Sequence, residues 1–278
     1  MDVHRLLAEG RGTLAGTDAP ELEAAILLGY VLGRDRAWFY AHPEAMVAGA
    51  DTARYRALLE RRRDGEPIAY LTGVREFWSL DLRVTPDVLI PRPETELLVE
   101  TALARIPPDA DWRIADLGTG SGAVALAIAA ERPGCEVHAT ELSDAALAVA
   151  RANAGRLLPG RIRFHAGSWC EPLRGAFRLI ASNPPYVDAD DPHLGRGDCC
   201  FEPRAALTPG ADGLAAIRAI ADCARAVLEA GGWLLFEHGF EQGAASRALL
   251  GELGYQEVET RADLAGRDRV TLGRRPVA

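Results

Sequence analysis

Lysine is absent from the 278-residue chain, so all 31 basic side chains are arginines. The formal net charge is −9, because 40 acidic side chains outnumber them. The absence of lysine excludes a P-loop, since that phosphate site requires one. An acidic chain is also a poor general binder of nucleic acid backbones. We therefore expect no direct nucleic-acid partner.

Cysteine is scarce, and the apolar runs are short. The five cysteines are odd in number and contain no C-x-x-C pair, which argues against a disulfide framework or a thiolate zinc site. No apolar stretch reaches the length that spans a bilayer, and residues 1–12 lack the apolar core of a signal peptide. We expect a cytoplasmic protein that has no membrane partner and no metal site and is a monomer.

The chain predicts three parts: a helical bundle over residues 1–75, a β-hairpin connector over 76–92 and an α/β domain over 93–278. In the first part a helix is predicted from Pro20, a residue favoured in a first turn, to a terminating Gly33. Its inward face is predicted to contain the recurring apolar residues Leu22, Ile26, Leu27, Tyr30 and Val31.

The connector shows alternation and the third part shows β/α periodicity. Apolar residues alternate from Phe77 to Val84, which predicts a strand that pairs with a second strand over 88–90. Beyond Glu94, helical patterns at 94–104, 122–131, 144–157, 213–229 and 242–253 separate seven strands at 113–117, 136–140, 161–165, 177–182, 233–237, 255–260 and 269–272. This order predicts a Rossmann-like, seven-stranded and mostly parallel sheet covered on both faces. The last two strands lack a helix between them and are expected to be antiparallel.

A glycine-rich turn closes the first strand of that sheet. Its members are Gly118, Thr119, Gly120, Ser121 and Gly122. The glycines let backbone approach a ligand, and a helix N-terminus follows. The spacing G-x-G-x-G differs from the dinucleotide spacing G-x-G-x-x-G, which disfavours an NAD oxidoreductase. S-adenosylmethionine, which carries an adenosine, a carboxylate and a reactive methyl, fits this turn.

Two further residues extend the cofactor prediction. Glu141 ends the next strand, where an acid binds ribose hydroxyls. Trp169 follows the third strand and could pack against adenine, although a core aromatic is the equally good alternative.

The stretch Asn183-Pro184-Pro185-Tyr186 follows the apolar strand at 177–182. Two prolines cannot continue a strand and therefore make a rigid loop at its carboxyl end, where ligands bind in open α/β sheets. The loop offers the Asn183 side-chain oxygen and the Pro184 carbonyl as acceptors and the Tyr186 ring as a flat wall. Such a site suits a planar group that carries an NH2. A turn capped by its own asparagine is the alternative.

These motifs resemble class I S-adenosylmethionine-dependent methyltransferases of the Asn-Pro-Pro-Tyr group. Four further stretches are similar to the release factor glutamine methyltransferase (PrmC/HemK) family: 62–78, 89–96, Phe201-Glu202-Pro203 and Glu237-His238-Gly239. The resemblance implies methylation of the glutamine in the Gly-Gly-Gln motif of class I peptide chain release factors, giving N5-methylglutamine, with release factors docking on the N-terminal bundle.

The resemblance also implies roles for individual residues. The cofactor would be lined by Gly118 to Gly122, Glu141, Trp169 and Asn183, and the glutamine would be bound by Asn183, Pro184, Pro185 and Tyr186. Asn183, Pro184 and Tyr186 would be the catalytic residues. The family often has aspartate where Glu141 stands. The sequence leaves open two other functions: a DNA adenine N6-methyltransferase, because adenine also presents an NH2, and a cofactor-binding scaffold.

Overall fold

The computed structural model describes residues 1–210 and 212–277. The chain divides into two compact units, Met1–Val74 and the residues from Arg75 onward. Each unit has its own hydrophobic core. None of the helices in the described ranges is long and apolar enough to cross a membrane.

The first unit is helical. Its helices are α1 (Val3–Thr13), α2 (Pro20–Leu32), α3 (Arg36–Ala41), α4 (Gly49–Arg63) and α5 (Ile68–Thr72). Asp2 and Asp35 begin α1 and α3 by accepting a backbone N–H three residues later, each at 2.8 Å. Gly33, in the left-handed region at φ 62°, ends α2 as the sequence predicts.

The predicted inward face of α2 is partly wrong. Leu27 and Val31 are buried, but Leu22, Ile26 and Tyr30 are 41%, 36% and 49% exposed. The apolar residues of α2 are distributed over nearly all sides of the helix. Periodicity alone therefore could not identify the side that faces the core. The three exposed residues, four apart, form an apolar stripe on α2.

The connector is a hairpin, but its position differs from the prediction. Strands β1 (Val74–Phe77) and β2 (Leu80–Arg83) form a two-stranded sheet. Trp78 and Ser79 make the turn in the left-handed region, at φ 53° and 58°. The single strand predicted over 77–84 is therefore wrong, and so is the second strand over 88–90.

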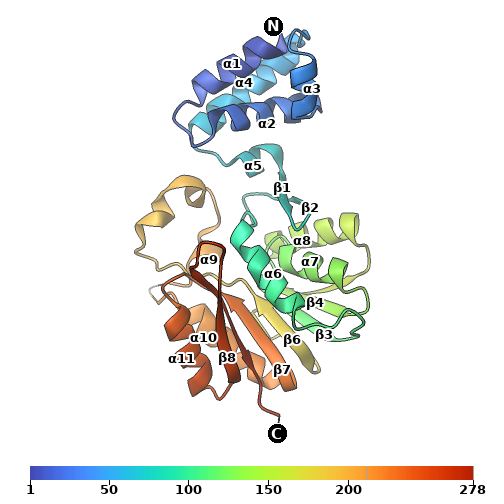
Figure 1. Ribbon diagram of the computed structural model, residues 1–278, viewed down its shortest axis with the longest axis vertical. Coiled ribbons are helices and arrows are strands. Elements are labelled where there is room, and N and C mark those ends of the chain that lie inside the picture. The colour runs from blue at the N-terminus through green and yellow to red at the C-terminus, as the bar shows by residue number, and fades with distance from the viewer. Residues whose placement is uncertain (211, 278) are drawn as a thin grey trace. The chain divides into compact units, whose positions relative to one another are not determined.

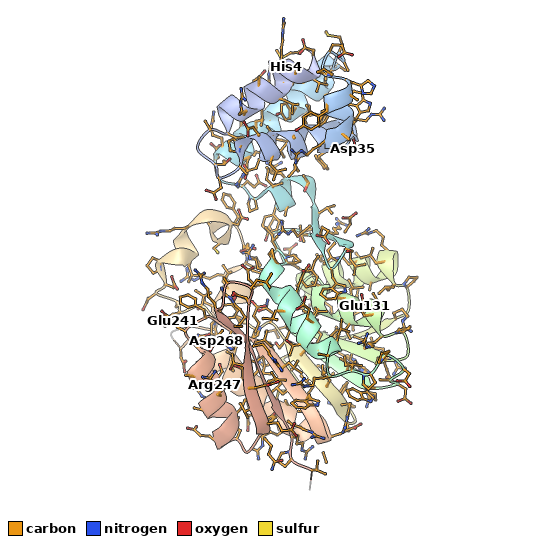
Figure 2. All side chains as sticks on the ribbon, viewed as in Figure 1. His4, Asp35, Glu131, Glu241, Arg247 and Asp268 are labelled. Carbon is orange, nitrogen blue, oxygen red and sulfur yellow. A yellow bond between two sulfur atoms is a disulfide. The ribbon has the colours of Figure 1, made fainter. Side chains whose placement is uncertain are left out.

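Acidic side chains stabilise this turn, which contains neither glycine nor asparagine. The residue types in the turn therefore gave no indication of its position. Glu76 accepts a hydrogen bond from the Ser79 N–H at 2.6 Å, and Glu96 accepts one from the Trp78 N–H at 3.1 Å. The Trp78 indole donates to Glu131 of α7 at 2.9 Å (Glu131 is labelled in Figure 2). These contacts replace the glycine or asparagine that such turns normally require.

The second unit contains the predicted seven-stranded sheet. Its strands are β3 (Arg113–Leu117), β4 (Glu136–Glu141), β5 (Ile162–Ala166), β6 (Phe177–Ser182), β7 (Leu228–Glu237), β8 (Gln256–Ala262) and β9 (Asp268–Arg274). The order is β5-β4-β3-β6-β7-β9-β8, and β9 runs antiparallel to both of its neighbours, β7 and β8. Figure 1 labels β3, β4, β6, β7 and β8 of this sheet. The mostly parallel sheet with an antiparallel final pair is confirmed.

Helices cover both faces of the sheet. On one side lie α6 (Glu96–Leu103), preceded by the turn η1 (Pro93–Thr95), α7 (Ala123–Glu131) and α8 (Asp144–Leu157). On the other side lie α10 (Ala215–Val227) and α11 (Gly243–Glu252). In the sequence, the segment between β6 and α10 contains the short helical turns η2 (Pro192–Gly195), η3 (Gly197–Cys200) and α9 (Arg204–Leu207). Neighbouring strand residues enter opposite cores, as Ile114 and Ala115 of β3 do.

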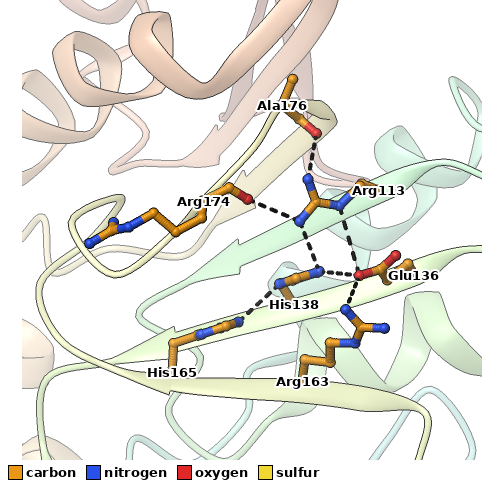
Figure 3. Close-up of polar contacts among 7 residues, drawn as sticks. All are labelled: Arg113, Glu136, His138, Arg163, His165, Arg174 and Ala176. Carbon is orange, nitrogen blue, oxygen red and sulfur yellow. Dashed lines mark hydrogen bonds and ion pairs between the residues drawn. The ribbon is translucent and has the colours of Figure 1, made fainter.

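A polar cluster includes Arg113 at the beginning of β3, Glu136 and His138 in the first half of β4, and His165 of β5 (Figure 3). Arg113 donates to the carbonyl oxygens of Arg174 and Ala176, at 3.0 and 3.2 Å. His138 contacts Glu136 at 2.8 Å, and its other ring nitrogen lies 2.9 Å from His165. Burial lowers the pKa of His138. The cluster ties the loop before β6 to the sheet.

One disulfide joins Cys170 to Cys223 of α10, with their Cα atoms 5.9 Å apart. The number and spacing of the cysteines argued against a disulfide framework. The two cysteines are 53 residues apart, so spacing gave no indication that the fold brings them together.

Candidate active site

A cavity of about 350 Å³ opens where β3, β4 and β6 end. The residues that follow these strands line one side: Gly118 to Ser121, Glu141 to Ser143, Asn183 and Pro185. The opposite side comes from two segments outside the sheet: Asp87 to Leu89, Pro91 and Thr95 from the first, and Pro203, Ala205 and Ala206 from the second. Ligands bind in such crevices of open α/β folds.

The glycine turn is pinned to the neighbouring strand. The N–H groups of Gly118 and Thr119 both donate to the Thr140 carbonyl, at 2.9 and 3.0 Å. Gly118 has φ 69°, and a Cβ there would lie 2.9 Å from the Trp169 ring. Gly120 has φ 56°, and a Cβ there would meet nothing within 4 Å. The turn therefore leaves open space for a ligand beside Gly120.

Glu141 faces the cavity in a fixed orientation. One carboxylate oxygen accepts the N–H of Gly120 and the other accepts the N–H of Ser143, both at 2.9 Å. Each oxygen keeps lone pairs, because a carboxylate offers about four acceptor positions. The carboxylate can therefore accept hydrogen bonds from ligand hydroxyls without losing its anchors.

Asp116 is a second carboxylate at the cavity, to which the sequence analysis assigned no role. One of its oxygens accepts from the Thr119 hydroxyl at 2.6 Å and from the Ala125 N–H at 3.1 Å. Burial raises its pKa to about 6, against the lowering effect of those two hydrogen bonds. Its place one residue before the strand ends was the available signal.

Trp169 lines the cavity. Its backbone has φ 43°, unusual for an aromatic residue, and its ring lies against Gly118. The ring thus forms a wall beside the glycine turn.

Asn183 and Pro185 line the cavity, whereas Gly122, Pro184 and Tyr186 are not among the described residues that do. The Asn183 side-chain NH2 donates to the Thr95 hydroxyl at 3.0 Å. The Tyr186 hydroxyl donates to Glu237 at 3.0 Å, and burial raises the pKa of Tyr186, so the hydroxyl keeps its proton. Gly122 instead begins α7 with φ 87°.

The structure adds two residues behind the Asn-Pro-Pro-Tyr loop. Glu237 ends β7, is 1% exposed, and accepts a hydrogen bond from the Thr95 hydroxyl at 2.7 Å. Both residues lie in the stretches that carry the family resemblance, but only the fold brings them to Asn183.

The side of the cavity formed by Pro203 to Ala206 is held by a buried carboxylate. Glu202 accepts from the Ile90 N–H at 2.9 Å and forms an ion pair with Arg92. These contacts attach the segment after η3 to the segment before α6, so two chain stretches about 110 residues apart in sequence form one wall.

Comparison with known proteins identifies the class and the family. Residues 5–73 match the family model "PrmC N-terminal domain" and residues 93–197 match "Methyltransferase small domain". A solved methyltransferase from Pyrococcus furiosus shares the fold, with a TM-score of 0.53 and 19% identity over 81% of this chain and 99% of that chain. The second unit is thus a methyltransferase domain.

Two curated relatives are named release factor glutamine methyltransferase. That of Salmonella typhimurium is 50% identical over 275 residues, 99% of each chain, and that of Bordetella pertussis is 52% identical over 262 residues, 94% of this chain and 97% of that protein. The chain belongs to the release factor glutamine methyltransferase family.

Proposed function

We propose that this protein transfers a methyl group from S-adenosylmethionine to the side-chain amide nitrogen of the glutamine in the Gly-Gly-Gln motif of class I peptide chain release factors. The product is N5-methylglutamine. The observation that carries the proposal is the state of Asn183, which lines the cavity. Its NH2 is bound to Thr95, and within residues 1–210 and 212–277 no hydrogen bond is made to its oxygen. Since release factors act in translation, the activity belongs in the cytoplasm.

The cavity residues fit the proposed methyl donor. Glu141 offers lone pairs suited to ribose hydroxyls, and the space beside Gly120 lets a ligand approach the backbone. Trp169 offers a wall for the adenine ring. Asp116, also at the cavity, suits a cationic amino group. When bound, S-adenosylmethionine supplies a methyl group activated by its positively charged sulfur.

The substrate amide needs help to react. Its nitrogen is a poor nucleophile, because the lone pair is delocalised into the carbonyl. Acceptors that draw the N–H bonds out of the amide plane localise that lone pair. The Asn183 oxygen and the Pro184 carbonyl are the two proposed acceptors. The hydrogen bonds that they accept become stronger as positive charge develops on the substrate nitrogen. The proton leaves to water after transfer.

Tyr186 and Pro185 complete the proposed substrate site. Pro185 lines the cavity, and the Tyr186 backbone carbonyl accepts a hydrogen bond from the Gln242 side chain at 3.0 Å. With its hydroxyl also bound to Glu237, the tyrosine ring has a fixed orientation. Although Tyr186 is not among the described residues that line the cavity, its fixed ring, one residue beyond Pro185, is proposed to hold the planar amide in line with the transferring methyl.

The helical unit is the proposed docking module for the release factor. Its match to the PrmC N-terminal domain supports this assignment, as does the apolar stripe of Leu22, Ile26 and Tyr30. Exposed apolar groups arranged on one helix are typical of protein recognition surfaces.

Mass spectrometry tests the proposal. The purified protein is incubated with a release factor and S-adenosylmethionine carrying a deuterated methyl group, and the Gly-Gly-Gln peptide is fragmented. We expect one labelled methyl on the glutamine side chain, and none when a release factor with Gln→Ala in that motif is used. An unlabelled glutamine, or a label on another residue, would contradict the assignment.

A further inference from the structure

The Asn183 amide is one end of a buried chain of hydrogen bonds. Its NH2 donates to the Thr95 hydroxyl, the Thr95 hydroxyl donates to one oxygen of Glu237, and the Tyr186 hydroxyl donates to the other. Thr95 is 4% exposed and Glu237 is 1% exposed. These hydrogen bonds connect η1, β7 and the loop after β6 behind the cavity.

The direction of these hydrogen bonds follows from the chemistry of the groups. An ionised carboxylate can only accept, and a hydroxyl has one hydrogen. The hydrogen of Thr95 is committed to Glu237, so Thr95 presents a lone pair to Asn183. Only the NH2 end of the Asn183 amide can bond to that lone pair.

The oxygen of Asn183 is consequently turned away from Thr95. Within residues 1–210 and 212–277, no hydrogen bond is made to this oxygen, and Asn183 lines the cavity. The two ends of an amide are nearly equal in size, so packing alone does not select between them. A flipped Asn183 would present its NH2 to the NH2 of the substrate, where no hydrogen bond can form.

We propose that Thr95 and Glu237 are positioning residues that select which end of the Asn183 amide faces the substrate nitrogen. Resting on the proposed function, the inference assigns these two residues no contact with the substrate. Glu237 fixes the hydroxyl of Thr95, and Thr95 fixes Asn183. Of these three residues, only Asn183 accepts a substrate N–H.

The ionisation state of Glu237 is part of this device. Burial raises the pKa of Glu237 above its ordinary value, although the hydrogen bonds from Thr95 and Tyr186 and the charge of Arg269 act to lower it and the charge of Glu94 acts to raise it. Protonated Glu237 can donate to the Thr95 oxygen. The Thr95 hydrogen is then free to turn toward Asn183 and favour the flipped amide, so kcat should fall on the acid side.

A double-mutant cycle tests the inference. Thr95→Val keeps the shape of the side chain and removes the hydroxyl, whereas Thr95→Ser keeps the hydroxyl. We expect Thr95→Val to lower kcat for release factor methylation roughly 10- to 100-fold, with KM for both substrates within about threefold, and Thr95→Ser to stay within about threefold of wild type. In an Asn183→Ala background, Thr95→Val should lower kcat by a further factor of less than about two, because the amide that Thr95 positions is absent.

Thr101→Val is the matched control. Thr101 of α6 is also a buried threonine, 6% exposed, and its hydroxyl donates to the Leu97 carbonyl at 2.7 Å, so its loss should leave kcat unchanged. Should Thr95→Val fail to fold, Glu237→Asp withdraws the carboxylate by one methylene and should lower kcat about tenfold or more.

The outcomes separate the two proposals. A wild-type kcat in Thr95→Val or Glu237→Asp, or an equal loss from Thr95→Val with and without Asn183, would overturn this inference while methylation by the wild type stands. A wild-type chain that leaves the release factor unmethylated would overturn the proposed function and this inference together.

Discussion

At the scale of single residues, Asp116 is a buried carboxyl group at the cavity whose pKa is shifted. Its side chain is buried, and burial raises its pKa to about 6, above the value near 3.9 of an unfolded chain. The folded state therefore holds this proton more tightly than the unfolded state. The stability that this group contributes is fully present below about pH 4 and is lost as the pH rises through about 6.

Asp116→Asn should remove that pH dependence. The variant cannot titrate, and its side-chain oxygen can still accept from Thr119 and Ala125. Between pH 4 and pH 7, the unfolding free energy of the wild type should fall by about 2 kcal/mol relative to the variant, because each pKa unit corresponds to about 1.36 kcal/mol and the unfolded carboxyl is already half ionised at pH 4. Urea unfolding at both pH values measures this difference, and parallel behaviour of the two proteins would contradict the assignment.

Tyr186 combines a ring and a hydroxyl whose contributions can be separated. Tyr186→Phe keeps the ring but leaves the buried Glu237 with one donor fewer, which should cost about 1–3 kcal/mol of stability. If the ring holds the substrate amide, Tyr186→Ala should lower kcat at least about tenfold more than Tyr186→Phe. Steady-state kinetics and thermal unfolding of both variants measure the two effects, and equal losses of kcat would assign the function to the hydroxyl.

At the scale of elements, the glycine turn shows two different requirements for glycine. Gly118 and Gly120 both have positive φ, but only at Gly118 would a Cβ collide with Trp169. Gly120→Ala should therefore cost about 1 kcal/mol from its backbone conformation. Gly118→Ala should lower the free energy of unfolding by more than Gly120→Ala does, because it also displaces the Trp169 ring.

Calorimetry of S-adenosylmethionine binding distinguishes the two glycine variants. Gly118→Ala should weaken binding about tenfold or more through the displaced Trp169 ring. A Gly118→Ala protein with both wild-type stability and wild-type affinity would show that the ring is not held as the structure places it.

Sequence patterns predicted the sheet because each strand is a buried apolar run between turns, and β3 and β6 were predicted with their observed bounds. The hairpin was misplaced because its turn is stabilised by Glu76 and Glu96, side chains that carry no turn signal. The cavity side formed by Val88, Leu89 and Pro203 could not be predicted, because it depends on contacts between segments distant in the chain. The contacts of Thr95 and Glu237 behind Asn183 could not be predicted for the same reason, although both residues lie in stretches that carry the family resemblance and the end of a strand suggested a structural role for Glu237 at the edge of the pocket.

At the scale of the whole molecule, the chain combines a methyltransferase domain with a separate helical unit. If the apolar stripe on α2 docks the release factor, binding and chemistry should be separable by mutation. Ile26→Ser should raise KM for an intact release factor about fivefold or more, the effect of losing about 1 kcal/mol of contact energy, with kcat unchanged.

The controls use a short substrate and a polar surface position. Methylation of a short Gly-Gly-Gln peptide should be unaffected by Ile26→Ser, because the peptide lacks the remainder of the release factor that would dock on the helical unit. Arg54 is an exposed residue of α4, and Arg54→Ser should leave the kcat and KM of both substrates unchanged. An unchanged KM for the intact release factor would place its docking surface elsewhere.

The Asn183 oxygen is the atom proposed to activate the substrate nitrogen, and the single-turnover rate of Asn183→Ala tests this role directly. With saturating S-adenosylmethionine and excess enzyme, methyl transfer to the release factor should be slower by roughly 10²–10³-fold, the effect of losing one preorganised polar contact. Affinity for S-adenosylmethionine should change much less. A transfer rate near that of the wild type would contradict the claim that the Asn183 oxygen activates the substrate nitrogen.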